Sequence, residues 1–171
     1  ITSHLFSSYA KINLGLQVIN KREDGYHNIH SIFVEIDLWD ELEIYPSAEF
    51  QLSASGINVS VDDSNLISKA YHLIRPKADS VQTEYAIHLK KRIPMGGGLG
   101  GGSSNAAATL NALNQLWNLN FTAAELEGFA NTIGSDVPFF IQGGLQLVGG
   151  IGDQLTPIDP RPLNDLHFLL V

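Results

Sequence analysis

The sequence contains no cysteine among its 171 residues. A disulfide, a thiolate nucleophile and a cysteine-ligated metal site are therefore all excluded. Proteins of a reducing cytoplasm typically lack disulfides, so the composition favours a cytoplasmic location.

Basic side chains are also scarce, because ten Lys and Arg stand against eighteen Asp and Glu, for a formal net charge of -8. Proteins that bind nucleic acid through phosphate contacts display a broad basic surface, so we predict no nucleic-acid partner. A small anionic ligand stays possible, since a pocket responds to local charge. The basic cluster Lys90–Arg92 is interpreted mostly as solvated surface. No apolar run reaches membrane-spanning length, which predicts no membrane partner.

The remaining composition is that of a folded globular chain, with 44% hydrophobic and 16% charged residues. Its length is sufficient for one domain with a full core. The sequence opens without an initiator Met and closes on an apolar run. We therefore expect a fragment, or the ordered part, of a longer protein.

Glycine, by contrast, is concentrated in one stretch. Six of the 16 glycines lie within Pro94–Ser104, between a strand-like and a helical pattern. Glycine loses the most backbone freedom on folding, so a dense run indicates a backbone that must approach a ligand closely. Bare N–H groups before a helix N-terminus favour an anion. A flexible linker is the alternative, but linkers separate domains, whereas ordered-looking elements flank this run closely.

Periodicity predicts an α+β protein, with strands grouped early and helices grouped around the glycine run. Alternation of apolar residues predicts strands over 8–18, 32–38, 41–45, 49–53, 84–93, 144–148 and 154–158. Helical spacing predicts a first helix from Asp63 or Ser64 to about Arg75. A second helix is predicted over 103–117, capped by Ser103 or Ser104. A third is predicted from the capping box at Thr122 to Gly134.

Three known phosphate loops do not fit the glycine run. A P-loop requires a lysine after its glycines, and none follows here. Gly96, Gly98 and Gly101 formally satisfy a dinucleotide fingerprint, but the required parallel βαβ unit is not indicated, and Glu125 is explained as a capping residue. A protein-kinase glycine loop requires His-Arg-Asp and Asp-Phe-Gly downstream, and neither occurs.

The remaining pattern, Pro-x-x-x-Gly-Leu-Gly-x-x-Ser-Ser-x-Ala-Ala, resembles the second motif of the GHMP kinase superfamily. Ala10–Leu14 resembles the N-terminal motif of that superfamily. Gly25–His27, Asn65–Ile67 and Gly134–Phe140 are similar to one subfamily, which phosphorylates a cytidine diphosphate derivative in isoprenoid precursor synthesis. The resemblance runs nearly end to end, while the C-terminal portion of the family, with its third motif, is absent from the sequence.

The resemblance implies a GHMP-kinase N-terminal domain of the ribosomal protein S5 domain 2-like type, with a mixed or antiparallel sheet and helices packed on it. Residues 1–158 would form this ATP-binding domain, and 159–171 would begin the connection to a C-terminal domain. A monomer or homodimer in a bacterial cytoplasm is expected, or in a plastid if a transit peptide has been removed.

The resemblance also implies ATP and Mg²⁺ as cofactors. The residues that would bind ATP are Asn65, Leu66, Pro94, Met95, Gly96, Gly97, Gly98, Leu99, Gly100, Gly101, Gly102, Ser103 and Ser104. Ser104 is in addition a candidate contact for the metal ion, and Mg²⁺ usually keeps few protein ligands.

Asp136 is the candidate catalytic base for the substrate hydroxyl, although a turn or N-cap aspartate is the common alternative. Alternation places Lys11 and Asn13 together on the polar face of the first strand, where a surface lysine is the default. The resemblance places Lys11 beside Asp136. Asn13, on the same face, is a candidate substrate contact, with an ordinary exposed strand amide as the alternative. The resemblance implies that Tyr26 and His27 bind the substrate, with Tyr26 stacked on the cytosine. The alternatives are another GHMP kinase, for homoserine, mevalonate or a sugar, and a non-catalytic nucleotide-binding relative.

Overall fold

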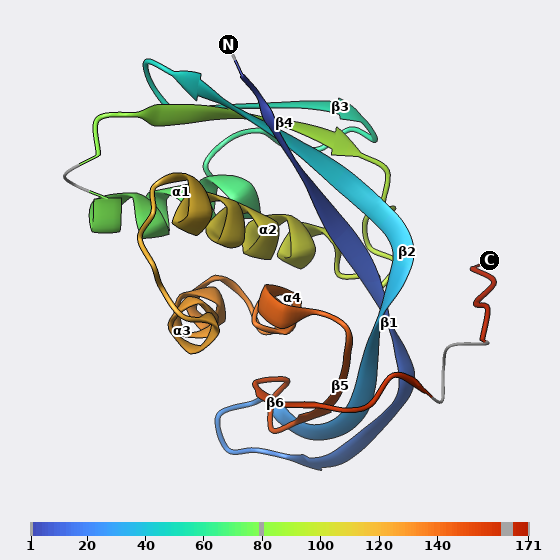
Figure 1. Cartoon of the computed structure of the whole chain (residues 1–171). Helices are drawn as coiled ribbons and strands as arrows, with labels where there is room; N and C mark the ends of the chain where they lie inside the picture. The colour runs from blue at the N-terminus through green and yellow to red at the C-terminus, as the bar shows by residue number, and fades with distance from the viewer. Residues whose placement is uncertain (1, 79–80, 162–165, 171) are drawn as a thin grey trace.

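The structure is a computed structural model, and it describes residues 2–78, 81–161 and 166–170. Its framework is a mixed six-stranded sheet with strand order β3-β4-β2-β5-β6, while β1 pairs separately with β2. Helices cover one face of this sheet (Figure 1). The strands are β1 (His4–Lys21), β2 (His27–Ser47), β3 (Gln51–Gly56), β4 (Glu84–Lys91), β5 (Leu145–Gly149) and β6 (Gln154–Pro157). Only β3 and β4 pair in parallel among these described strands.

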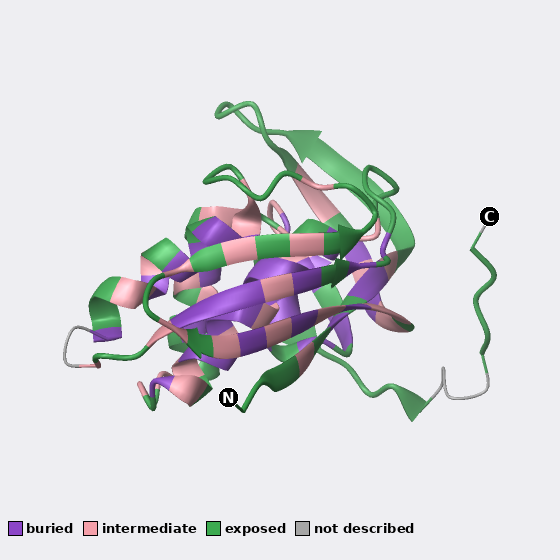
Figure 2. Ribbon diagram, turned by 90° about the horizontal axis from the view of Figure 1, so that it is seen from above, coloured by how far each residue is buried: buried purple, intermediate pink, exposed green. Residues whose placement is uncertain are grey.

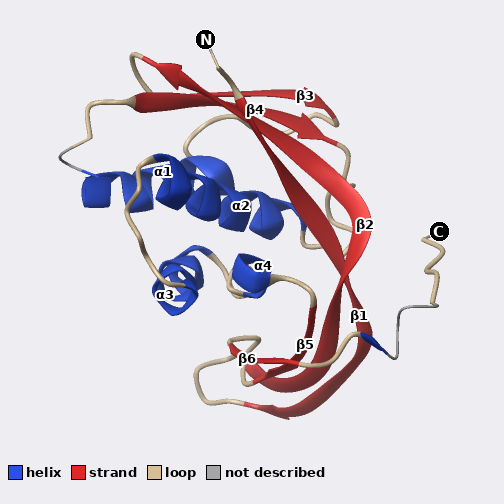
Figure 3. Ribbon diagram, in the orientation of Figure 1, coloured by secondary structure: helices blue, strands red, loops and turns tan. Residues whose placement is uncertain are grey.

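The long strand β2 is the central element of the fold. The prediction of two separate strands over 32–38 and 41–45 was wrong, because one strand of 21 residues spans both. One end of β2 pairs with β4 and the other end with β5, so a single bent strand joins both parts of the sheet (Figure 3). β1 follows β2 along this bend through register shifts at Tyr9/Ala10, Asn13/Gly15 and Val18/Asn20. Such bulges bend a strand and interrupt its alternation.

Four α-helices and one 3₁₀ turn complete the described fold: α1 (Leu66–Ile74), η1 (Arg75–Ala78), α2 (Gly101–Leu116), α3 (Ala123–Ile133) and α4 (Phe139–Gln142). The capping box at Thr122 and Glu125 and the end of α3 at Gly134 are confirmed. Among the described residues, no helix is long and apolar enough to cross a bilayer.

Two predicted helix starts were wrong. Asn65, and neither Asp63 nor Ser64, caps α1, since its Oδ1 accepts the N–H of Ile67 at 2.9 Å. The helix α2 begins two residues before Ser103, and its N-cap is Gly100 with φ of 69°. Glycine adopts this left-handed conformation without strain, so the glycine run itself sets the start of the helix.

The core lies between the sheet and the helices, where buried residues concentrate (Figure 2). Leu42 and Ile44 of β2 and Ile87 and Leu89 of β4 supply the sheet side. The helix side is built by Ile67, Ala70 and Tyr71 of α1 and by Ala106, Leu110 and Leu113 of α2. This packing fixes the axis of α2, and with it the direction in which its N-terminus points.

Candidate nucleotide and catalytic site

The glycine loop between β4 and α2 has a backbone that only glycine adopts easily. Gly96, Gly98 and Gly100 have φ angles of 77°, 73° and 69°. These values lie in the left-handed region, which is strained for residues with a Cβ atom. The N–H of Lys11 donates to the carbonyl of Leu99 at 2.9 Å, so the loop is fastened to β1.

Close packing explains the glycines at the start of α2. A Cβ atom on Gly100 would lie 2.6 Å from Cζ of Phe140 and 3.2 Å from Cγ of Lys11. A Cβ atom on Gly101 would lie 2.7 Å from Nζ of Lys91 and 2.9 Å from a methyl carbon of Ile93. The loop is therefore pressed onto β1, β4 and α4 and does not act as a linker.

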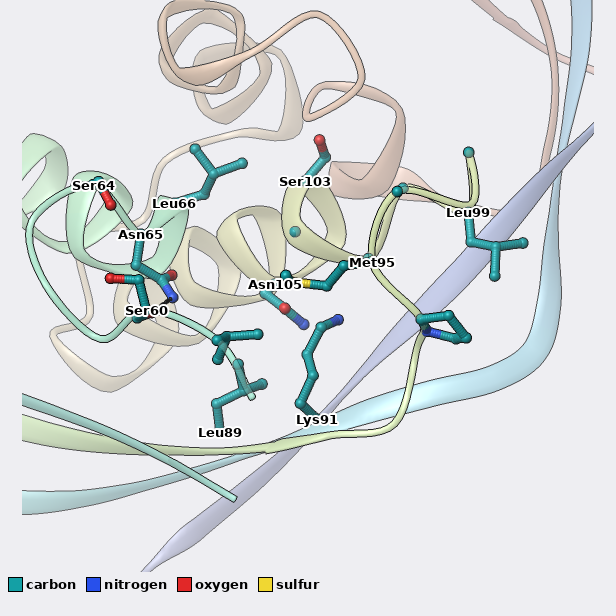
Figure 4. Close-up of a pocket in the computed structure, with 17 residues that line it drawn as sticks. Ser60, Ser64, Asn65, Leu66, Leu89, Lys91, Met95, Leu99, Ser103 and Asn105 are labelled. Carbon is teal, nitrogen blue, oxygen red and sulfur yellow. Dashed lines mark hydrogen bonds between the residues drawn. The ribbon is translucent and has the colours of Figure 1, made fainter. Parts of the chain in front are cut away.

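The loop forms one wall of a cavity of about 430 Å³, which suits a small-molecule ligand (Figure 4). The opposite wall is the segment before α1. The lining residues are Val59, Ser60, Ser64, Asn65, Leu66, Leu89, Lys91, Pro94, Met95, Gly96, Gly98, Leu99, Gly100, Gly101, Gly102, Ser103 and Asn105. Of the thirteen residues predicted to bind ATP, Gly97 and Ser104 do not line it.

The N-terminus of α2 gives this cavity a surface suited to an anion. No side chain caps the helix, and its first turn contains no acidic residue. The backbone N–H groups at the start of a helix lack intrahelical partners, and the aligned peptide dipoles place partial positive charge there. Gly101, Gly102 and Ser103 of this first turn all line the cavity, as expected of a phosphate-binding helix N-terminus.

Lys91 and Asp40 form a buried ion pair beneath this helix N-terminus. Their side chains are 3% and 0% exposed. The interpretation of Lys91 as solvated surface was wrong, and the strand pattern contained the signal that identifies it. Residues 87, 89 and 91 share one face of β4, and Ile87 and Leu89 on that face are core residues. Asp40 shares a face of β2 with buried Leu42 in the same way.

Lys11, Asn13 and Asp136 come together on the other side of the loop. Nζ of Lys11 lies 3.5 Å from Oδ2 of Asp136 and donates to Oδ1 of Asn13 at 2.6 Å. It also lies 4.2 Å from the centre of the Phe33 ring. Asp136 belongs to the turn between α3 and α4, and its side chain is 35% exposed. A buried cation thus holds a carboxylate that solvent and a substrate can reach.

The burial of Lys11 corrects one expectation, since simple alternation placed it on a solvated face. Ala10 and Lys11 are both buried although they are consecutive. The bulge between Tyr9 and Ala10 interrupts the alternation and turns Lys11 inward. The predicted proximity of Lys11 and Asn13 is confirmed by their hydrogen bond.

The two serines at the start of α2 differ in surroundings. Ser103 lines the cavity, whereas Ser104 is buried, and its Oγ accepts a hydrogen bond from Oγ of Ser8 at 2.7 Å. Asn105 in turn donates to Ser8 and to Asp40, both at 2.9 Å. Ser104 therefore belongs to a buried polar network behind the cavity wall, and its contact with a metal ion stays a prediction.

Tyr26 and His27 lie apart from these groups. Tyr26 lies in the turn between β1 and β2, and His27 is the first residue of β2. This turn is at the end of the hairpin remote from α2 (Figure 1). The Tyr26 side chain is exposed, while its backbone N–H donates to Oδ1 of Asp24 at 3.1 Å. No described contact joins either residue to Lys11 or Asp136, and their contact with substrate stays a prediction.

Comparison with known proteins agrees with this geometry. Residues 65–144, which include the start of α1, the glycine loop and Asp136, match the family described as the GHMP kinases N terminal domain. The match to a GHMP kinase N-terminal domain thus lies in residues 65–144, and the expected α+β fold is confirmed.

Its curated relatives include kinases named 4-diphosphocytidyl-2-C-methyl-D-erythritol kinase. The relative from Prosthecochloris aestuarii is 44% identical over 89% of this chain and 53% of its own length. The relative from Caldanaerobacter subterraneus is 45% identical over 92% of this chain and 54% of its own length. The chain therefore spans about half the length of the curated relatives it matches.

Solved structures give the same result. A crystal structure of 4-(cytidine 5'-diphospho)-2C-methyl-D-erythritol kinase matches with a TM-score of 0.77 at 39% identity, over 91% of this chain and 55% of that chain. The mevalonate kinase of Methanococcus jannaschii matches with a TM-score of 0.66 at 16% identity, over 92% of this chain and 56% of that chain. The second likeness concerns the fold alone.

Proposed function

We propose that this domain serves an ATP-dependent kinase that phosphorylates a hydroxyl of 4-diphosphocytidyl-2-C-methyl-D-erythritol. The products would be the 2-phosphate and ADP, within the non-mevalonate route to isoprenoid precursors. The relatives that carry this kinase name support the substrate. The observation that carries the chemistry is the position of the Lys11–Asp136 pair directly beside the glycine loop.

On the donor side, the cavity offers two kinds of surface to ATP. Val59, Leu66, Leu89 and Met95 provide an apolar wall against which a purine ring packs. The N-terminus of α2 and the glycine loop offer backbone N–H groups to the phosphates. The terminal phosphate would lie at the end of the loop near Gly100, where an added Cβ atom would come within 3.2 Å of Cγ of Lys11.

Mg²⁺ fits this site as an ion carried mainly by the phosphates. It binds few protein ligands and prefers oxygen donors. Ser103 offers a hydroxyl in the cavity wall, while the proposed contact of Ser104 would require its hydroxyl to turn away from Ser8. The ion would neutralise charge between the phosphates and hold them in one geometry.

On the acceptor side, Asp136 is proposed to take the proton of the substrate hydroxyl. The hydroxyl oxygen forms a bond to the γ-phosphorus, the bond from that phosphorus to the β-phosphate oxygen breaks, and ADP leaves with the electron pair. Nζ of Lys11, 3.5 Å from Oδ2 of Asp136, would offer positive charge to the forming bond. Asn13 orients Lys11 through its hydrogen bond.

The remaining predicted roles are retained as proposals. Tyr26 and His27 would contact the cytosine, which the diphosphate separates from the reacting hydroxyl. Residues 1–158 are proposed as the ATP-binding domain and 159–171 as the start of a connection to a further domain. A cytoplasmic monomer or homodimer, without a nucleic-acid or membrane partner, is proposed for the whole protein.

The test is Asp136→Asn in the full chain, assayed by ADP release with the cytidine substrate. We expect turnover to fall about 10²- to 10⁴-fold, the usual contribution of a general base, while Mg·ATP binding measured by calorimetry is retained. Asp37→Asn, at an exposed aspartate of β2, is the matched control. Near-normal turnover of Asp136→Asn would disprove the assignment of the base.

A panel of acceptors tests the substrate itself. We expect activity with the cytidine substrate and background rates with homoserine, mevalonate and simple sugars. A preference for one of the latter would replace the proposed acceptor and keep the kinase. ATP binding without turnover on any acceptor would indicate a non-catalytic nucleotide-binding protein.

A further inference from the structure

The Asp40 carboxylate connects three parts of the nucleotide site. It accepts hydrogen bonds from the Lys91 ammonium, from Nδ2 of Asn105 at 2.9 Å, and from the backbone N–H groups of Arg92 at 2.6 Å and Ile93 at 2.8 Å. Lys91 ends β4, Arg92 and Ile93 lead into the glycine loop, and Asn105 belongs to α2. Asp40 itself is supplied by β2 and is fully buried.

A buried ion pair at this place calls for a specific reason. Removing two charges from water is costly, and well-packed apolar residues often stabilise a fold equally well. Asp40 and Lys91 lie on faces whose other members, Leu42 and Leu89 among them, are apolar. Stability alone therefore does not account for a salt bridge at this position.

The reason for the ion pair is that Lys91 lies at the N-terminus of α2. The Lys91 ammonium lies next to Gly101, where a Cβ atom would come within 2.7 Å of Nζ. A cation is unfavourable at a helix N-terminus, because the helix dipole places positive charge there. The negative charge of Asp40 holds the ammonium at this point before any anion has bound.

We propose that Asp40 is a positioning residue of the nucleotide site, which aims Lys91 at the phosphates of ATP and fixes the backbone that leads into the glycine loop. This inference rests on the proposed ATP-dependent function. An ammonium has three N–H donors, and the described contacts of Lys91 assign one of them to Asp40. Lys91 also lines the cavity, although its side chain is 3% exposed, so a phosphate oxygen would have to reach the N-terminus of α2 to meet the other donors (Figure 4).

The lysine proposed here to bind phosphate occupies a different place in the sequence from the lysine of a P-loop. In a P-loop the lysine follows the glycines, whereas here it precedes them on the strand. A lysine on a strand beneath the helix cannot be oriented by the loop itself. Its direction must come from a neighbouring strand, and Asp40 of β2 provides it.

The experiment is a double-mutant cycle in the full chain with Asp40→Asn, Lys91→Met and the two combined. Dissociation constants for Mg·ATP are measured by calorimetry and melting temperatures by scanning calorimetry. Lys90→Met is the matched control, because Lys90 is the neighbouring lysine, is half exposed and pairs only distantly with Glu41, at 3.9 Å. Asn at position 40 keeps the shape and an acceptor oxygen for the backbone N–H groups.

We expect Asp40→Asn and Lys91→Met each to weaken Mg·ATP binding by about ten- to a hundredfold, which corresponds to one hydrogen bond to a charged group. The double variant should bind no more weakly than Lys91→Met, because Asp40 acts through Lys91. It should also melt higher than Asp40→Asn, since no unpaired buried cation remains. In steady-state assays, KM for ATP should rise while KM for the acceptor stays unchanged.

A merely structural role would give a different pattern. Binding would then follow melting temperature, so that the double variant would recover affinity together with stability. That result, or an Asp40→Asn protein that binds Mg·ATP like the unsubstituted protein, would overturn the inference. If Asp40→Asn does not fold, Lys91→Met decides the matter, because unchanged affinity in that variant also refutes the proposal. Failure of the unsubstituted protein to bind Mg·ATP would refute the proposed function itself, which is a separate outcome.

Discussion

Individual glycines of the loop serve two distinct physical purposes. Gly96 and Gly98 have positive φ angles with open space around the position of a Cβ atom. Gly101 has no positive φ angle but lies against Lys91 and Ile93. Gly100 combines both requirements, since its φ is positive and Phe140 and Lys11 occupy the space beside it. This residue is therefore the least replaceable of the loop.

Gly100→Ala should accordingly lower the free energy of unfolding by about 1–3 kcal/mol, through backbone strain and contact with the Phe140 ring. It should also weaken Mg·ATP binding, because the start of α2 must shift. Urea unfolding and calorimetry measure the two effects.

Gly128→Ala is the matched control for that substitution. Gly128 is exposed within α3, and nothing lies within 4 Å of its added Cβ atom. Alanine there should raise the free energy of unfolding by up to about 1 kcal/mol, the difference in helix propensity. Equal stabilities of the two alanine variants would show that the conformation of Gly100 is not constrained as described.

Among the secondary-structure elements, α1 and β4 are joined by a polar cluster that supports one wall of the cavity. Arg75, directly after α1, donates to Oε1 of Glu84 through Nε at 2.7 Å, and Tyr71 of α1 donates to the same carboxylate. The guanidinium also bonds the carbonyls of Ala78 and Val81. This cluster fixes α1, whose first residues reach the nucleotide cavity.

The cluster stabilises the fold at neutral pH, and this contribution to the free energy of unfolding is lost in acid. The hydrogen bond from Arg75, followed by that from Tyr71, lowers the pKa of Glu84. A lowered pKa stabilises the fold above the ordinary pKa of glutamate, about 4.3, and this stabilisation disappears as pH falls through the folded-state pKa. Glu84→Gln should therefore be less stable than the unsubstituted protein at pH 7, and the difference should shrink towards pH 3.

Thermal melts between pH 3 and 7 measure this difference. Glu23→Gln, at an exposed glutamate of the β1–β2 turn, serves as the control and should give a constant offset. A stability difference for Glu84→Gln that does not change across this pH range would contradict the role given to the ion pair.

In the whole molecule, the nucleotide cavity is assembled from segments that lie far apart in the sequence. Residues 59–66, the end of β4 and the loop with the start of α2 each contribute a wall. The elements that hold these segments also carry much of the core, including Ile67 of α1, Leu89 of β4 and Ala106 of α2. A nucleotide that contacts all three walls should therefore stabilise the domain as a unit.

Mg·ATP at a hundred times its dissociation constant should raise the free energy of unfolding by about 2.7 kcal/mol. For a chain of this size the melting temperature should then rise by roughly 5–10 °C. Scanning calorimetry measures the shift, which Asp136→Asn should share at the same ratio of ligand to dissociation constant. The absence of any shift in the unsubstituted protein would argue against a nucleotide in this cavity.

Local patterns in the sequence determined most of the elements and the nature of the loop. The capping box of α3, the glycine run and the alternating strands are signals carried by neighbouring residues, and the structure contains all of these features. The resemblance of short motifs added the superfamily, which the matching family confirms. The roles of Lys11 and Asp136 stay predictions that the geometry supports.

Only the tertiary structure decided which polar side chains are buried and which meet. The bend of β2 and the bulge at Tyr9/Ala10 turn Lys11 inward, and α2 covers Asp40 and Lys91. Periodicity describes one element at a time, whereas these results depend on the pairing and packing of several. The glycine loop was visible in the sequence, but the lysine beneath it became identifiable only when β2, β4 and α2 were seen together.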